Sequence, residues 1–74
     1  MDSVWLRYEM HMERLIIYPK DVMIVTGKTE RHARYLLQRI KKSLQKEEHQ
    51  VITIAEFAEY LGVDLEEVKR VIFL

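Results

Sequence analysis

Residues 27–44 read GKTERHARYLLQRIKKSL, and this stretch decides the fold. Gly27 can take the positive φ that ends a helix, and Thr29 is a favourable N-cap for a new one. Apolar side chains then recur at helical spacing, namely Ala33, Leu36, Leu37, Ile40 and Leu44. We therefore expect a helix from Thr29 to about Gln45 with one side facing a core.

The opposite side of this predicted helix is basic and polar. Its solvent arc carries Arg31, Tyr35, Gln38 and Lys42, flanked by Arg34, Arg39 and Lys41. Arginine can bind guanine and glutamine can bind adenine through two hydrogen bonds, so base contacts are expected from Arg31, Tyr35 and Gln38. The expected phosphate contacts are Lys28, Thr29, His32, Arg34, Arg39 and Lys42. A basic face that meets only solvent is the alternative interpretation.

The residues before Gly27 predict a shorter helix. Pro19 pushes Tyr18 out of the helical region and suits the first position of a helix, which we expect to run from Pro19 to Thr26. A short helix, a glycine turn and a second helix form a helix-turn-helix arrangement. In its DNA-binding form, the second helix enters the major groove.

The second half of the chain repeats this order after a polar linker at 47–50. Thr53 and Glu56 have the spacing of a capping box and predict a helix that ends at Leu61, before Gly62. Asp64 and Glu67 predict a second box, which starts a helix to about Ile72. The exposed residues expected here are mostly acidic, so this half is expected to repel phosphate.

A shift of 35 residues superimposes the two halves by pattern. The matched pairs are Ile17 and Ile52, Val22 and Phe57, Gly27 and Gly62, Ala33 and Val68, Leu36 and Val71, and Leu37 and Ile72. We therefore predict a mainly α fold in which two helix-turn-helix-like pairs pack on one core. The extended segments near 16–18 and 51–53 could also pair as a short two-stranded ribbon.

The length of 74 residues indicates one domain, 1–74, with three parts. Residues 1–14 are expected to form an N-terminal helix that starts after Ser3 and includes Trp5, or else a loose arm. Residues 15–46 form the basic helix-turn-helix, and residues 51–74 form the acidic repeat. The apolar end at 71–74 is expected to cover the core or to form a dimer seam.

Charge is divided unevenly along a chain whose formal net charge is zero. Residues 15–46 carry eight Lys and Arg against two acids, a net charge of +6. Residues 47–74 carry two Lys and Arg against seven acids, a net charge of −5. A basic middle beside an acidic end is compatible with a nucleic-acid partner, because local charge sets the local field.

Several classes of protein are not expected. The chain has no cysteine and no apolar run long enough to cross a membrane, and its N-terminus lacks the pattern of a secretory signal, so a cytoplasmic protein without a membrane partner is expected. Gly27-Lys28-Thr29 looks like the end of a phosphate-binding loop, but Val22 stands where that loop needs glycine. The three histidines are scattered. No catalytic residue, metal, cofactor or small-molecule substrate is therefore expected, and the protein is not expected to be an enzyme.

Two stretches resemble known families. Tyr18-Pro19-Lys20-Asp21-Val22, continuing through residues 27–50, resembles short and mostly uncharacterised bacterial helix-turn-helix proteins associated with mobile elements. Thr53-Ile54-Ala55-Glu56-Phe57 and the following residues to 63 are similar to the lead helix of excisionase-type domains. These resemblances imply DNA binding, although the acidic residues 65–70 depart from the basic helix that follows in the excisionase type.

The expected function is binding of duplex DNA through the helix at 29–45, as a small transcriptional regulator or a recombination or excision accessory factor. Two copies would span neighbouring turns of the duplex, so a homodimer is one expected arrangement. The alternative is a non-enzymatic helical adaptor that binds another protein. An adaptor helix should expose more leucine, phenylalanine or methionine than this helix is expected to expose.

Overall fold

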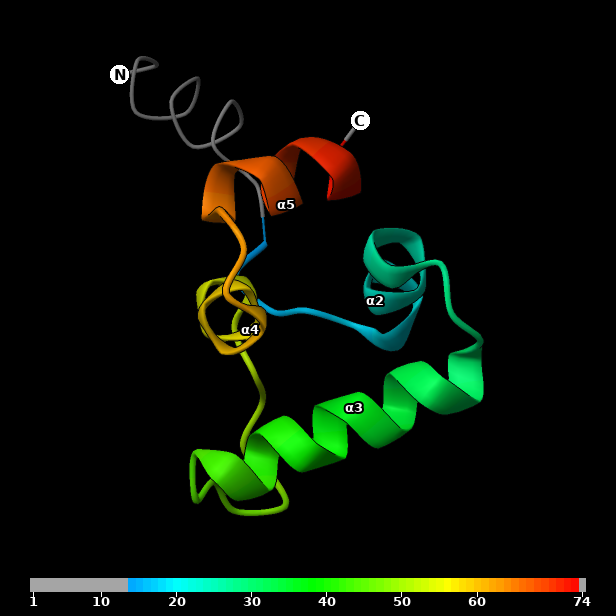
Figure 1. The fold of residues 1–74 in the computed structure, drawn as a ribbon. Helices are drawn as coiled ribbons and strands as arrows, with labels where there is room; N and C mark the ends of the chain where they lie inside the picture. Colours follow the sequence, from blue (N-terminus) through cyan, green and yellow to red (C-terminus); the bar gives the residue numbers. More distant parts are fainter. Residues whose placement is uncertain (1–13, 74) are drawn as a thin grey trace, which may run out of the picture.

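The computed structural model describes residues 14–73, which form four helices and no strand. The helices are α2 (Pro19–Thr26), α3 (Glu30–Ser43), α4 (Ile54–Leu61) and α5 (Leu65–Ile72). α2 packs against α3 and α5, and α4 packs against α5 (Figure 1). The predicted mainly α fold is confirmed. The predicted N-terminal helix or arm, with Trp5, lies outside the described residues except for Arg14, which is not helical.

Both helix-turn-helix pairs have the predicted glycine turns. Gly27 follows α2 with a φ of 72°, and Gly62 follows α4 with a φ of 75°. In each case the glycine N–H donates to a carbonyl of the preceding helix, which ends that helix in the left-handed region. The turns are short, so the second helix of each pair starts close to the end of the first.

Three of the helix starts follow from their caps. The Thr29 hydroxyl accepts from the backbone N–H of His32 at 3.2 Å. The box at Thr53 is complete: its hydroxyl accepts from the Glu56 N–H at 3.0 Å, and Glu56 accepts from the Thr53 N–H at 2.9 Å. Asp64 caps α5 as predicted, by accepting from the Glu66 N–H at 3.3 Å.

The predicted role of Glu67 in the second capping box is wrong. The carboxylate of Glu67 lies 3.5 Å from the guanidinium of Arg70, one turn along α5, and no capping box forms there. The predicted end of α3 is also two residues too late. Gln45 has a φ of 57°, and the Lys46 N–H donates to the Lys41 carbonyl, so a left-handed residue closes the helix after Ser43.

The core combines residues from both repeats. Its buried apolar side chains are Ile17, Val22, Ala33, Ile40, Ile52, Ile54, Phe57, Ala58 and Val68. Four of the predicted repeat pairs therefore match in the structure. Three of them are pairs of buried residues, and the fourth is the pair of glycine turns. The prediction that Leu44 lies in the core is wrong. Its side chain is 41% exposed, because Leu44 is the C-cap and lies beyond the last helical residue.

The two extended segments that precede α2 and α4 lie side by side. Ile16 and Thr53 form one isolated antiparallel bridge. The Ile17 N–H donates to the Ile52 carbonyl at 3.1 Å, and the Ile54 N–H donates to the Leu15 carbonyl at 2.7 Å. This pairing is shorter than the two-stranded ribbon considered from the sequence. The pairing joins the two repeats at the side of the core. Ile72 and Phe73, at the end of the chain, also pack against that core.

Candidate nucleic-acid interface

α3 presents one long face to solvent, opposite the side that enters the core. Ala33 and Ile40 are fully buried, and Leu36 and Leu37 are half-buried against the core. At about 100° per residue, these positions fix the opposite side of the helix as the exposed arc. The rotation of α3 about its axis is therefore set by apolar packing, as the sequence pattern predicts.

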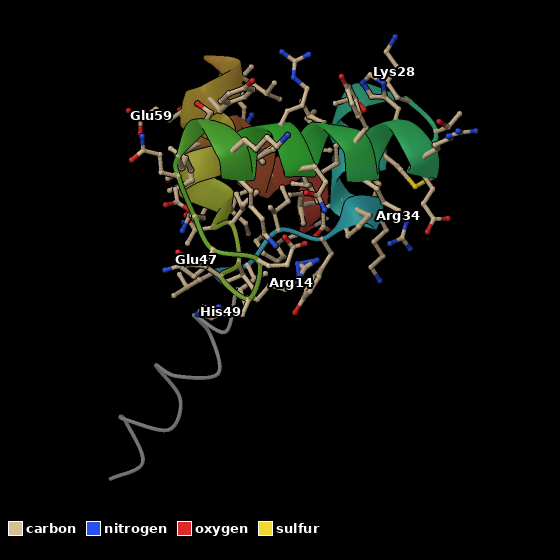
Figure 2. The ribbon with its side chains drawn as sticks, turned by 90° about the horizontal axis from the view of Figure 1, so that it is seen from below. Arg14, Lys28, Arg34, Glu47, His49 and Glu59 are labelled. Atoms are coloured by element: carbon tan, nitrogen blue, oxygen red, sulfur yellow. The ribbon has the colours of Figure 1, made fainter. Side chains whose placement is uncertain are left out.

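All of the predicted contact residues are exposed. They are Lys28 and Thr29 in the turn before α3, followed by Arg31, His32, Arg34, Tyr35, Gln38, Arg39 and Lys42 on the helix. Figure 1 shows α3 along the bottom of the molecule, and Figure 2, seen from below, shows it in front of the other described elements. We call these nine residues the α3 face.

The three residues expected to approach base edges share the centre of the α3 face. Arg31, Tyr35 and Gln38 follow one another at spacings of four and three residues, which places them in one row along the helix. Tyr35 is 60% exposed. The guanidinium carbon of Arg39 lies 5.8 Å from the centre of the Tyr35 ring, so a cation and an aromatic ring lie together beside this row.

The cations of the α3 face differ in whether they form ion pairs with carboxylates of the protein. Arg34 donates to the Glu30 carboxylate from Nη2 at 2.6 Å and from Nε at 3.1 Å. Within residues 14–73, by contrast, no ion pair involves Lys28, Arg31, Arg39 or Lys42. In this part of the chain, these four cations therefore have no carboxylate partner to leave before they meet an anion.

Acidic side chains lie mainly beyond the C-terminal end of α3. In Figure 2, Glu47 and Glu59 lie near that end, whereas Lys28 and Arg34 lie near the other. Lys46, just after α3, pairs with Glu56 at 3.2 Å. Glu30 is the only acid within α3, in its first turn, where a carboxylate is favourable to the helix dipole.

Sequence reasoning missed a hollow beside the α3 face. It lies between α3, residues 16–19 and residues 51–52, and has a volume of about 220 Å³. Arg34, Gln38 and Lys41 line it from α3. The helical pattern places these three on one flank of α3, but only the packing of the two extended segments creates the hollow.

A metal-binding cluster and a membrane-spanning helix are both absent from the described part of the chain. Among residues 14–73, no group of three or more His, Asp or Glu side chains is placed to hold a metal ion. None of the four described helices is long and apolar enough to cross a membrane.

Comparisons with known proteins leave the family open. No protein-family model, no curated protein and no solved structure matches this chain. The resemblance of residues 18–50 to short bacterial helix-turn-helix proteins therefore stays a prediction, and the same holds for the resemblance of residues 53–63 to the excisionase type.

Proposed function

We propose that the protein binds duplex DNA by placing the α3 face in the major groove. The observation that carries this proposal is the gathering of four cations, which form no ion pair within residues 14–73, on and just before the exposed side of α3, around the row that holds Arg31, Tyr35 and Gln38. An α-helix fits the major groove, where arginine and glutamine read base edges. A small regulator or a recombination accessory factor is the class of protein that this activity suits.

The contacts divide by position along the arc. Arg31, Tyr35 and Gln38, in the central row, would approach base edges. Lys28 and Lys42, near the two ends, and Arg39, on one side, would bind phosphates and set the register of the helix. Arg34 would exchange its exposed partner Glu30 for a phosphate at small cost, because exposed ion pairs contribute only about 0–1 kcal/mol.

A protein-binding adaptor is less well supported by this surface. Between Arg31 and Lys42, Tyr35 is the only large apolar side chain that is more than a third exposed. Protein interfaces place apolar and aromatic anchors at their centre and few charges there. The α3 face has the reverse composition, with cations around one aromatic ring.

The test compares two double variants of the full chain in a titration of a labelled mixed-sequence duplex, followed by fluorescence anisotropy. Arg31→Ala/Arg39→Ala removes two cations from the α3 face. Lys20→Ala/Arg70→Ala removes two exposed cations elsewhere, so both variants change the net charge equally. We expect the first pair to weaken binding at least tenfold and the control pair to weaken it about twofold.

The salt dependence gives a second readout. If three to five phosphates are neutralised, log Kd should rise with log salt concentration at a slope of roughly 3–4.5, and each lost phosphate contact lowers that slope by about 1. Equal weakening by both double variants would show that net charge, not the α3 face, drives binding. No binding at low salt by the folded protein would reject the proposal and favour the adaptor.

A further inference from the structure

The hollow beside α3 has an apolar floor. Ile17 and Ile52 are buried beneath it, and Leu37 borders it from α3. Tyr18 and Val51 also line it and remain 45% and 48% exposed. The pairing of the two extended segments keeps these side chains together, because the Ile17 N–H and the Ile52 carbonyl are bonded across the floor.

The rim of the hollow is cationic. Arg34 and Lys41 line it, with the amide of Gln38 between them, and no acidic side chain among residues 14–73 lines it. In Figure 2, Arg34 extends from α3 toward the side on which the lead-in to α2 and Arg14 lie, whereas Lys28 lies on the other side. An anionic group at this rim would therefore meet two cations and an amide.

The rim still has hydrogen-bond donors to offer. Arg34 uses Nε and Nη2 on Glu30, which leaves its Nη1 group. Lys41 donates to the Glu48 carbonyl at 2.8 Å, and an ammonium has three donors, so two remain. A carboxylate could accept from both side chains without breaking the bonds that they already make.

We propose that this hollow binds a small organic acid, with its compact apolar body on the Ile17–Ile52 floor and its carboxylate between Arg34 and Lys41. The volume of about 220 Å³ is below the usual range for drug-sized ligands, so the body is one aromatic ring or a branched chain of similar size. Apolar contact and charge complementarity are both required, because either alone is weak in so open a site.

The first experiment tests binding without DNA. The full ¹⁵N-labelled chain is titrated with 3-phenylpropionate and, separately, with its neutral isostere 3-phenylpropanamide. We expect saturable shifts of the backbone amides at 16–18, 37–41 and 51–52, with a Kd of about 0.1–1 mM for the acid. The neutral isostere should bind about tenfold more weakly. Equal shifts by both compounds, or shifts spread over the whole chain, would overturn the proposal.

Two matched pairs of variants locate the site. Lys41→Met removes a rim cation, and its control, Lys42→Met, removes the neighbouring cation that does not line the hollow. Val51→Glu places an acid in the hollow, and its control, Val63→Glu, changes an equally exposed valine elsewhere. We expect Lys41→Met to weaken binding of the acid about fivefold and Val51→Glu to abolish it, while both controls bind normally. Failure of either contrast would overturn the proposal.

Occupation of the hollow should also regulate the α3 face, an extension that rests on the proposed function. A bound acid would neutralise Arg34 and cover one side of Gln38, so saturating 3-phenylpropionate should weaken DNA binding severalfold in the anisotropy titration. The effect should be absent with 3-phenylpropanamide and in Val51→Glu. If the protein binds the acid but not DNA, the proposed DNA-binding function is rejected and the proposed ligand site is retained. If DNA binds and the acid does not, the ligand site fails.

Discussion

The carboxylate of Glu56 makes two interactions at the start of α4. It accepts the Thr53 N–H in the capping box and pairs with Lys46 across the loop that follows α3. The Thr53 backbone hydrogen bond, together with Lys46, lowers the pKa of Glu56 below its usual value, and partial burial only partly opposes them. The sequence predicts the box, but not the contact with Lys46, which depends on the path of residues 44–53.

The lowered pKa of Glu56 makes its contribution to stability depend on pH. A carboxyl whose folded pKa is depressed stabilises the fold above its unfolded pKa, and this contribution is lost as the pH falls through the folded pKa. We therefore expect Glu56→Gln to lower the free energy of unfolding at pH 7, and the difference from wild type to shrink below about pH 4.5. Urea unfolding at a series of pH values measures it.

Glu59→Gln is the matched control, since Glu59 is exposed on the same helix, and its side chain makes no hydrogen bond or ion pair within residues 14–73. Its difference from wild type should be small at every pH. A Glu56→Gln difference that stays constant from pH 7 to pH 3 would contradict the assigned cause of the shift.

The residues of the α3 face are also predictable one by one. Ala33 and Ile40 fix the buried side, so the exposure of the seven residues that lie on the helix follows from spacing. The Glu30–Arg34 pair also follows from spacing, because the two residues are four apart on the helix. What spacing cannot give is whether Arg34 keeps Glu30 or exchanges it for a phosphate.

At the scale of elements, caps and glycine turns set most boundaries. Thr29, Thr53 and Asp64 start their helices where the sequence places them, and Gly27 and Gly62 end theirs. The end of α3 could not be predicted in the same way, because glutamine rarely takes the left-handed conformation that Gln45 adopts. The local bonds from Gln45 and Lys46 back to α3 compensate for that conformation.

The two glycine turns predict matched costs of substitution. No neighbouring atom lies within 4 Å of a Cβ added at Gly27 or Gly62, so only the positive φ opposes a side chain. We expect Gly27→Ala and Gly62→Ala each to lower the free energy of unfolding by about 1–2 kcal/mol, and the asparagine variants to lower it less. Thermal and urea unfolding of the four variants measure this.

Asparagine is the informative comparison at both turns, because it tolerates the left-handed region better than alanine. If alanine and asparagine cost the same at both turns, the conformation is not the cause. If either variant at Gly27 also lost DNA binding while remaining folded, the turn would contribute a contact of its own.

At the scale of the whole molecule, a buried charge joins segments that the sequence leaves apart. Asp21 is 1% exposed and accepts from the Tyr18 N–H at 2.9 Å and from Arg14 Nη2 at 2.6 Å. The Arg14 guanidinium carbon lies 5.2 Å from the centre of the Tyr18 ring and 5.3 Å from that of Phe73. The sequence indicates only that Asp21 is an acid in the first turn of a helix, since nothing local shows that Arg14 reaches it or that Phe73 packs on Arg14.

Removal of this charge should destabilise the whole fold. Asp21→Asn leaves the partly buried Arg14 without its carboxylate, and one buried nitrogen of Arg14, Nη1, already has no hydrogen-bond partner within residues 14–73. We expect a loss of about 2–3 kcal/mol in the free energy of unfolding, because removal of one partner leaves the other charge partly buried and without a counter-charge. Urea unfolding followed by circular dichroism measures it.

The exposed pair Arg34–Glu30 provides the comparison for Asp21. Both of its side chains are more than half exposed, so Glu30→Gln should cost less than about 1 kcal/mol. The double variant Arg14→Met/Asp21→Asn should recover part of the loss seen in Asp21→Asn, because no charge is then left unpaired. Equal losses from Asp21→Asn and Glu30→Gln would contradict the role given to the buried pair.

The single bridge between the two repeats has a kinetic consequence. Ile17 and Ile52 are 35 residues apart in the chain, and the segment between them contains all of α2 and α3. Rupture of this junction together with the packing of α2 on α5 would release the basic half as a unit while its helices stay wound, a subglobal opening that costs less free energy than complete unfolding. Slow amide exchange at Ile17 and Ile54 would report on that opening. The exposed linker at 47–50 is then where a protease would first cut the molecule.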